Sequence, residues 1–381
     1  MRPFELESRT RLVFGPGALG RLGALARELG FARTLVVSDP GVVAAGYAAR
    51  ACRALESAGI AVSTFSAFDH DPTSAMADAG ASVARAQGVD SLVGLGGGSS
   101  MDCAKSIAFL HANGGHMPDY RGYAKAKQSL PPMIGVPTTA GTGSEAQSYA
   151  LVSDDVSHEK MACGDASAAF KVAILDPELL LSLPRAVTAA TGFDAIAHAV
   201  ETWVTSSRTP ASDLYAREAF RLLDLSYDRV LADPLDLEAR GATLLGAHWA
   251  GAAIEASMLG ATHACANPLT ARYGTTHGVA ISLLLPHVVR WNGAVAGDRY
   301  AELLAAVGRP APKGEAAAAL AARLEALAVA GDLPRGLRSI GVPEADLEAL
   351  AAEAAQQWTG RFNPRPFDEK AAQELYRAAY A

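Results

Sequence analysis

Short β-branched runs alternate with alanine-rich stretches through the first half of the chain, and few folds accommodate this alternation. A run such as TLVVS at residues 34–38 is short and apolar, which is typical of a buried strand, whereas the stretches between such runs favour helices. The pattern predicts strands at 34–38, 61–65, 91–94 and 133–136 and helices at 43–58 and 74–87. Strands and helices in this order indicate an α/β fold in which helices cover a parallel sheet.

The second half of the chain has a different pattern. Strand signals stop near Leu183 and Pro184, and the remainder indicates helices separated by glycine and proline, with an alanine-rich helical segment at 314–330. A chain of 381 residues, half of them apolar, can bury two cores. We therefore predict two domains, an α/β domain over residues 1–183 and a helical domain over residues 184–381.

Charge and cysteine content exclude several functional classes. The net charge is −7 and the lysines and arginines form no run, so we expect neither nucleic acid nor a membrane as a partner. The longest apolar run, near 278–285, is too short to span a bilayer, and residues 1–12 carry charges where a signal peptide would be apolar. The four cysteines show no CxxC spacing, which argues against a disulfide framework. These features predict a cytoplasmic enzyme.

A glycine-rich turn follows the predicted strand at 91–94. The segment LVGLGGGSSMDCAK, residues 92–105, passes from this strand through three glycines into Ser99 and Ser100, which open a helix. Glycines let backbone N–H groups approach a phosphate, and a helix N-terminus adds partial positive charge, so a pyrophosphate would bind well there. The dinucleotide fingerprint is matched only in part, and a plain tight turn is an equal alternative from these residues alone.

Two further features stand at the ends of predicted strands. Asp39 follows the strand at 34–38, where an acidic side chain can bind a ribose 2′-hydroxyl and repel the 2′-phosphate of NADP, although an Asp-Pro turn gives the same pattern. The segment PTTAGTGSE, residues 137–145, offers four small hydroxyls after the strand at 133–136. This density favours ligand contact, and a loop hydrogen-bonded to itself is the alternative.

A candidate metal site begins in the segment TAATGFDAIAH, residues 188–198. Asp194 and His198 stand four residues apart among apolar residues, so a helix capped by a threonine of this segment presents both side chains on one face. With His263 and His277 they provide one carboxylate and three imidazoles, which suit Fe²⁺ or Zn²⁺ better than Ca²⁺ or Mg²⁺. An Asp-x-x-x-His pair by itself is more often a hydrogen-bonded helix pair than a metal site.

Together these segments resemble the iron-containing (group III) alcohol dehydrogenase family. The resemblance extends over nearly the whole chain, from FGPGAL at residue 14 to NPRPF at residue 363, and its motifs stand in the family's order. The motifs are GGGS at 96–99 with Asp102 and Lys105, PTTAGTGSE at 137–145, TAATGFDAIAHAVE at 188–201, His263, and HGVA at 277–280 before LLLPHV.

The resemblance implies an architecture and a set of site residues. The fold is expected to be like that of dehydroquinate synthase, with a dinucleotide-binding domain over residues 1–183, a metal-binding helical domain over residues 184–381, and the active site in the cleft between them. The four metal-ligand positions of the family are occupied by Asp194, His198, His263 and His277. The family's cofactor positions are occupied by Asp39, Gly97, Gly98, Ser99, Thr138, Thr139, Gln147, Leu151 and Lys160.

The function implied by the resemblance is hydride transfer between NAD(H) and an alcohol, aldehyde or ketone. The metal, Fe²⁺ or alternatively Zn²⁺, is expected to act as a Lewis acid on the substrate oxygen. One alternative is a reductase of a carboxylate- or phosphonate-bearing substrate, like maleylacetate reductase. Another is a lyase like dehydroquinate synthase, which uses NAD without net redox change. A small-molecule substrate and a homodimer or larger homo-oligomer are expected in the leading case.

Some positions near the predicted site depart from the family pattern or bear on the substrate. Many relatives carry a second histidine four residues after the third ligand, whereas this chain has Asn267, whose amide cannot shuttle protons near neutral pH. Tyr149 and Ile254 stand where relatives line the substrate pocket. Arg272 could bind a substrate carboxylate, and a solvated or intersubunit arginine is the alternative. Asn267, Tyr149 and Ile254 together indicate a substrate other than a plain short primary alcohol.

Overall fold

The computed structural model describes residues 4–68, 72–155 and 159–381. The chain divides into two compact units, Glu7–Ser182 and Leu183–Ala381, and residues 4–6 belong with the second. The first unit has mixed helices and strands, and every named element of the second is a helix. The α/β and helical halves predicted from the sequence are therefore both present.

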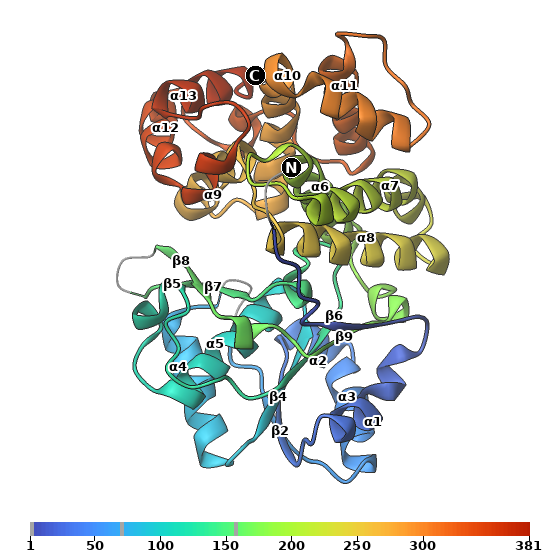
Figure 1. The fold of residues 1–381 in the computed structure, drawn as a ribbon, viewed down its shortest axis with the longest axis vertical. Coiled ribbons are helices and arrows are strands. Elements are labelled where there is room, and N and C mark those ends of the chain that lie inside the picture. Colours follow the sequence, from blue (N-terminus) through green and yellow to red (C-terminus); the bar gives the residue numbers. More distant parts are fainter. Residues whose placement is uncertain (1–3, 69–71, 156–158) are drawn as a thin grey trace. The chain divides into compact units, whose positions relative to one another are not determined.

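A six-stranded parallel sheet forms the centre of the N-terminal unit (Figure 1). Its strands are β1 (Arg11–Phe14), β2 (Arg33–Val37), β3 (Ala61–Phe65), β4 (Ser91–Gly96), β6 (Met133–Pro137) and β9 (Val172–Leu175). The order is β1-β9-β6-β4-β2-β3, and every neighbouring pair runs parallel. The central strands β4, β6 and β9 are buried along their whole length, as expected for a parallel sheet covered on both faces.

Helices cover both faces of this sheet. They are α1 (Leu22–Glu28), α2 (Pro40–Ala44), α3 (Tyr47–Ser57), α4 (Ser74–Ala86) and α5 (Gly98–Asn113). Helix α1 packs against α3 and α4 packs against α5, and the two pairs lie on opposite faces of the sheet (Figure 1). The single helix predicted at 43–58 is wrong, because Gly46 adopts φ 80, a left-handed conformation that ends α2 before α3 begins.

A small second sheet belongs to the same unit. Its strands are β5 (Gly122–Tyr123), β7 (Tyr149–Ser153) and β8 (Lys160–Gly164), in the order β5-β8-β7. Strands β7 and β8 pair antiparallel, and β5 pairs parallel with β8. The sequence analysis predicted none of these strands, nor β1 and β9, although β7 and β8 are as long as the predicted strands β2 and β3.

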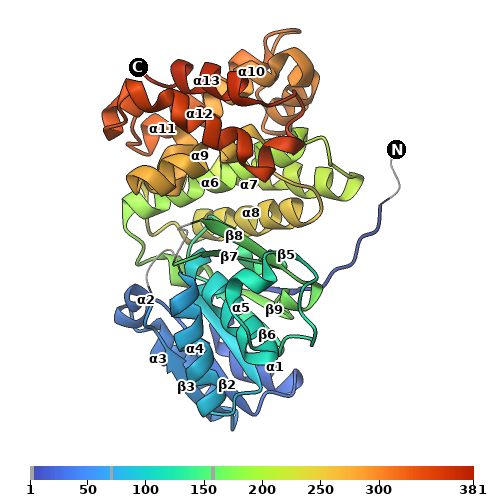
Figure 2. The same ribbon diagram turned by 90° about the vertical axis from the view of Figure 1, so that its left-hand side faces the viewer.

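The C-terminal unit consists of packed helices. They are α6 (Arg185–Val204), α7 (Pro210–Ala232), α8 (Leu237–Glu255), α9 (Ala261–Tyr273), α10 (His277–Ala306), α11 (Ala316–Ala330), α12 (Leu347–Gln356) and α13 (Glu369–Ala378). Helices α6, α7 and α8 lie side by side, while α10 packs against α6 and α11 (Figure 2). Helix α6 is thereby surrounded, and from Thr188 onward nearly all its residues are buried.

The start of α6 differs from the prediction. The helix begins at Arg185, directly after Pro184, and no side chain caps it. Thr188 instead accepts a hydrogen bond from Arg240 at 2.9 Å, and Thr191 donates to a backbone carbonyl one turn earlier at 2.8 Å. The predicted threonine cap is wrong, and the first two predicted metal ligands lie in the middle of a longer helix.

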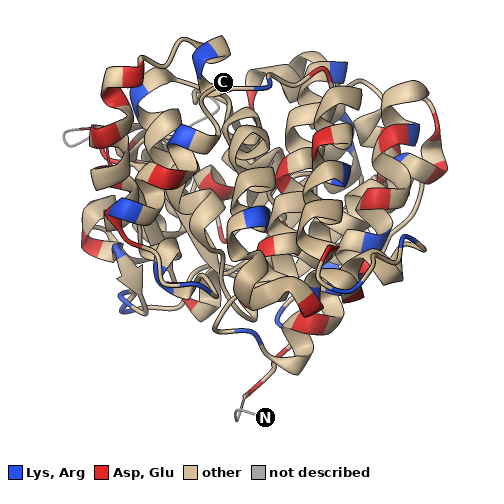
Figure 3. Cartoon of the chain, turned by 90° about the horizontal axis from the view of Figure 1, so that it is seen from above, with Lys and Arg blue, Asp and Glu red and all other residues tan. Residues whose placement is uncertain are grey.

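Two surface properties bear on possible partners. Positions of Lys and Arg are interspersed with positions of Asp and Glu along the chain drawn in Figure 3. Helix α10 is long and apolar enough to cross a membrane by length and composition alone, yet 67% of that apolar window is buried inside the protein. Its hydrophobicity is therefore that of a core helix.

Candidate functional site

The four predicted metal ligands come together in the C-terminal unit. Helix α6 carries Asp194 and His198, α9 carries His263, and α10 begins with His277. Asp194 Oδ1 lies 3.4 Å from Nε2 of both His198 and His263. The same oxygen lies 3.8 Å from His277 Nε2. Donor atoms of Asp194, His263 and His277 all lie within 4.8 Å of one another, which is close enough to share one cation.

Two buried polar atoms that face one another in this cluster have no hydrogen bond within the described chain. Asp194 is 5% exposed and His263 is 4% exposed. Across the described parts of the chain, neither Asp194 Oδ1 nor His263 Nε2 finds a hydrogen-bond partner. A buried polar atom left in this way costs about 1–3 kcal/mol, so two of them facing one another fit the place of a bound cation. The nitrogen and oxygen donors suit Fe²⁺ or Zn²⁺.

The electrostatics of the cluster favour positive charge at its centre. Burial raises the pKa of Asp194, but the neighbouring His198, His263 and His277 outweigh burial and hold that pKa well below its usual value. Burial lowers the pKa of His263, and Glu201 and Asp194 outweigh it, raising the pKa to about 9. A metal ion would replace the proton at Nε2, because a ligand imidazole must offer a lone pair.

Glu201 is a buried partner of this cluster that the sequence analysis missed. It is 4% exposed on α6, and one carboxylate oxygen accepts a hydrogen bond from Nδ1 of His263. Its other oxygen accepts from the backbone N–H of Thr262 at 2.7 Å. With Nδ1 bound to Glu201, the Nε2 edge of the ring faces Asp194. A signal was present in the sequence, because Glu201 stands seven residues after Asp194 and three after His198, on the same helix face.

Of the three predicted substrate-lining residues of this unit, two bind other side chains and one is buried. Asn267, on α9, donates from Nδ2 to Oε1 of Gln357 at 3.0 Å. Arg272, near the end of α9, pairs with Glu353 through both its Nε and one terminal nitrogen. Ile254, on α8, is 7% exposed. Arg272 already has a carboxylate partner, so the structure gives no support for a role in binding an acidic substrate.

In the N-terminal unit, Asp39 and the glycine turn adjoin at the carboxyl ends of β2 and β4. Asp39 caps α2, accepting from the Val42 backbone N–H at 3.1 Å, and its other oxygen accepts from Ser100 Oγ at 3.1 Å. Gly96 has φ 148, and a Cβ there would lie 2.1 Å from Ser100 Oγ and 2.7 Å from Asp39 Oδ2. Glycine is therefore required at this position by both conformation and space.

The predicted hydroxyl loop, residues 137–145, packs directly against this turn. The backbone N–H of Thr138 donates to the Gly96 carbonyl at 2.9 Å. A Cβ at Gly97 would lie 3.4 Å from Thr139, and one at Gly98 would lie 2.8 Å from the Thr142 hydroxyl. Helix α5 begins at Gly98, so the partial positive charge of its N-terminus lies at the place where the turn and the loop meet. Ser99 follows in the first turn of α5.

The remaining predicted cofactor residues lie on or beside the small sheet. Gln147 precedes β7 and donates to the Thr142 carbonyl at 2.9 Å. Leu151 on β7 is 39% exposed, and Lys160 at the start of β8 is also exposed. The ring of Tyr149, at the start of β7, packs against the ring of Tyr123 with centroids 5.5 Å apart. The predicted cofactor residues of this unit therefore lie at the start of α2, in the glycine turn and the hydroxyl loop, and on or beside β7 and β8.

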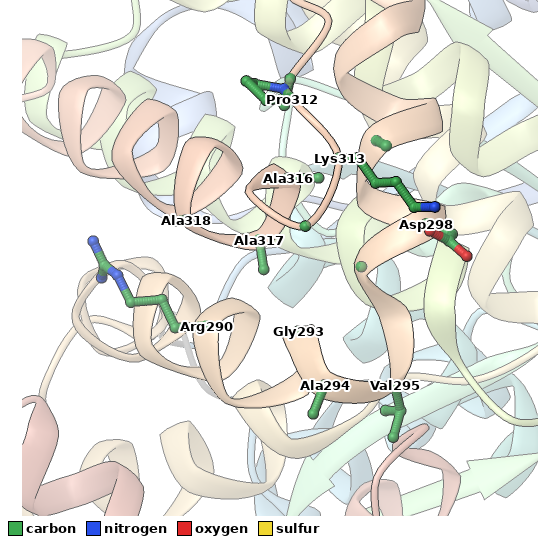
Figure 4. A pocket seen from close by; sticks show the side chains of 14 residues that line it. Arg290, Gly293, Ala294, Val295, Asp298, Pro312, Lys313, Ala316, Ala317 and Ala318 are labelled. Carbon is green, nitrogen blue, oxygen red and sulfur yellow. The ribbon is translucent and has the colours of Figure 1, made fainter.

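A cavity of about 810 Å³ lies elsewhere in the C-terminal unit (Figure 4). It is lined by α10, α11 and the segment that joins them, with small residues such as Gly293, Gly297 and Ala317 and with Arg290 and Lys313. Its lining, as far as the chain is described, includes none of the predicted ligand or cofactor residues. The cavity is therefore separate from the candidate site.

Comparison with known proteins adds an independent finding. A family model described as iron-containing alcohol dehydrogenase matches residues 9–177, and one described as the C-terminal part of the Fe-containing alcohol dehydrogenase family matches residues 188–380. The chain is 33% identical over 357 residues to the NAD-dependent methanol dehydrogenase of Bacillus methanolicus, covering 93% of each chain. The whole chain also matches two solved structures over their full length. One is a 1,3-propanediol oxidoreductase, with a TM-score of 0.97 and 31% identity. The other is an NAD⁺ complex of sulfoacetaldehyde reductase from Bifidobacterium kashiwanohense, with a TM-score of 0.90 and 27% identity.

Proposed function

The chain belongs to the iron-containing alcohol dehydrogenase family, and on that premise we propose which of its residues carry the reaction and how. As a member of that family it is a metal-dependent oxidoreductase, which transfers a hydride between NAD(H) and an alcohol, aldehyde or ketone. Its metal ligands are the four residues of the α6–α9–α10 cluster, Asp194, His198, His263 and His277. Fe²⁺ is the proposed metal, and Zn²⁺ is an alternative that the same donors accept.

One observation carries the metal assignment. Nitrogen and oxygen donors from three helices converge on one point. Those on α6 and α9 are buried, His277 on α10 is partly exposed, and two of the buried donors have no hydrogen bond in the described chain. A divalent cation held there supplies Lewis acidity to a substrate oxygen. Asp194 contributes the negative charge that retains the cation, and Glu201 orients His263 so that its Nε2 faces inward.

The dinucleotide is proposed to bind the N-terminal unit. Gly97, Gly98 and Ser99 place backbone N–H groups and the N-terminus of α5 where a pyrophosphate would bind. Asp39, at the end of β2, favours NAD over NADP because a carboxylate repels a 2′-phosphate. Lys160, exposed on β8, is proposed to reach the ribose. Replacing Asp39 with glycine is then expected to raise activity with NADPH relative to NADH, measured as a ratio of kcat/KM values.

Metal reconstitution tests the proposed function. The protein is stripped of metal with a chelator, divided, and loaded with Fe²⁺ under anaerobic conditions or with Zn²⁺. Each sample is assayed for NADH formation across a panel of alcohols and for NADH consumption with the matching aldehydes and ketones. We expect turnover only in a metal-loaded sample, with NADH released into solution. Equal turnover in the stripped sample would contradict the metal assignment, and product without net NADH change would favour the lyase alternative.

Other parts of the sequence prediction remain proposals. We propose a homodimer or larger homo-oligomer, supported by the family resemblance, and a cytoplasmic location, supported by the composition and the dispersed charge. Sedimentation or light scattering at several protein concentrations measures the first, and cell fractionation the second. The substrate is proposed to be a small molecule, and the panel above measures its class.

A further inference from the structure

We propose that Asp102 and Lys105 form a clamp that holds the hydroxyl loop and β7 against α5 and thereby preorganises the dinucleotide site. The inference rests on the proposed function, because it concerns how the proposed cofactor contacts are kept in place. Both residues belong to the GGGS-x-x-D-x-x-K segment, in which the proposed function uses only the glycines and the first serine. The contacts that carry the inference all lie within the N-terminal unit.

Lys105 is a fully buried lysine, and three of its hydrogen bonds join separate segments. It is 0% exposed on α5, and its Nζ donates to the carbonyl of Ser144 at 2.8 Å and to the hydroxyl of Ser144 at 2.9 Å. A third hydrogen bond goes to the carbonyl of Tyr149 at 2.7 Å. An ammonium group has three N–H donors, so these bonds match its donors in number. Nζ also lies 5.2 Å from the ring centroid of Phe170, within the range of a cation–π contact.

Asp102 completes the network on the same face of α5. It stands three residues before Lys105, and its Oδ1 accepts a hydrogen bond from Ser144 Oγ at 2.8 Å. Burial raises the pKa of Asp102, while Lys105, Ser144 and the backbone of Leu151 act against that increase. The hydroxyl of Ser144 therefore donates to Asp102 and accepts from Lys105, so one small side chain in the loop is held by both members of the pair.

The segments joined by this network are those that carry the proposed cofactor residues. Ser144 lies in the hydroxyl loop, which also contains Thr138 and Thr139. Tyr149 is the first residue of β7, which also contains Leu151. Helix α5, which carries the clamp, begins at the glycine turn. A buried charge is costly unless it is paired and hydrogen-bonded. The arrangement of the three segments in which Lys105 and Asp102 keep their hydrogen bonds is therefore strongly preferred over arrangements in which the loop or β7 moves away from α5.

The consequence for binding is a matter of preorganisation. A site whose loop and strand are already ordered loses less conformational freedom when a ligand binds. Asp102 and Lys105 act through Ser144, Tyr149 and Leu151 rather than through assigned contacts with the dinucleotide. They are therefore positioning residues, and their loss should weaken NADH binding more than it changes the chemical step.

The test compares two clamp variants with a matched control in the full-length protein. Lys105→Met removes the charge and the three hydrogen bonds described above, and Ser144→Ala removes only the hydroxyl that joins the pair. The control is Asp90→Asn, at the opposite end of β4. Asp90, like Asp102, is half-buried, and it accepts hydrogen bonds from the backbone of Ala32 and Arg33. Folding is checked by circular dichroism and thermal unfolding, and NADH affinity by fluorescence titration.

We expect the Kd for NADH to rise about tenfold in Ser144→Ala and further in Lys105→Met. The KM for NAD⁺ should rise in parallel, while kcat at saturating NAD⁺ and the Zn²⁺ affinity stay close to wild type. Asp90→Asn should lower the unfolding temperature and leave the NADH Kd unchanged, which separates positioning from general stability. If Lys105→Met does not fold, Ser144→Ala decides the question.

The failure of the clamp and the failure of the proposed function give different results. A folded Ser144→Ala protein that binds NADH as tightly as wild type would overturn the clamp, as would an equal loss of affinity in Asp90→Asn. A wild-type protein that binds no NADH at all would instead overturn the proposed function. Weaker NADH binding in Lys105→Met and Ser144→Ala, with unchanged binding in Asp90→Asn, supports both the clamp and the proposed function.

Discussion

Replacing Glu201 with glutamine is the sharpest test of the proposed metal site, because it changes one heavy atom of a residue that is not itself a proposed ligand. Glutamine keeps the shape of the side chain and keeps one oxygen, which can still accept from the backbone N–H of Thr262. The other oxygen, which accepts from His263 Nδ1, becomes an amide nitrogen that can only donate. The ring is then driven to the tautomer with its proton on Nε2, the nitrogen that faces Asp194.

The size of the effect follows from these contacts. Loss of a partner that orients a ligand histidine typically reduces metal affinity by about 10–100-fold, which corresponds to about 1.4–2.8 kcal/mol. The backbone N–H of Thr262, at the start of α9, keeps its hydrogen-bond acceptor in the variant. The free energy of unfolding of the metal-free protein should therefore fall by only about 1 kcal/mol. The variant should therefore lose more free energy of metal binding than free energy of unfolding.

Competition with a chromogenic chelator measures the Zn²⁺ affinity of wild type and variant. Asp224→Asn provides the control, because Asp224 is a buried carboxylate of the same unit that pairs with Arg323 at 2.8 Å. Breaking that ion pair should lower the free energy of unfolding by about 3 kcal/mol and leave the Zn²⁺ affinity unchanged. The reasoning would be refuted by a Glu201→Gln protein with wild-type affinity, or by an Asp224→Asn protein that loses affinity to the same degree.

Three further outcomes are expected. Gly96→Ala should lower the free energy of unfolding by about 2 kcal/mol or more and weaken NADH binding, because its Cβ would overlap Ser100 Oγ at 2.1 Å; thermal unfolding and fluorescence titration measure both. Arg272→Ala should leave the KM for carboxylate-bearing substrates unchanged, since Arg272 is already ion-paired, and a higher KM would restore the acidic-substrate alternative. Burial raises the pKa of Cys163 to about 12, so at pH 8 it stays protonated and should resist alkylation in the folded protein, while the partly exposed Cys52 reacts slowly; peptide mass spectrometry distinguishes them.

Local pattern was enough to predict the fold class. The alternation of apolar runs and alanine-rich stretches predicted the parallel sheet, and β4 and β6 lie where their apolar runs stand. The face shared by Asp194 and His198 was readable because a helix repeats every 3.6 residues. The break at Gly46 was missed, because a few residues carry too weak a periodic signal to separate one helix from the next. Strands β7 and β8 were also missed, although they are as long as the predicted strands β2 and β3.

The sequence by itself determined the composition of the candidate site: which residues can be metal donors, which turn can receive a phosphate, and which motifs place the chain near a family. Only the tertiary structure decided how those residues are supported. Glu201 and His263 are 62 residues apart, and Ser144 is 39 residues from Lys105, yet each pair is joined by a buried hydrogen bond. Such partners are selected by the packing of whole helices and strands, which is a long-range property that no local spacing encodes.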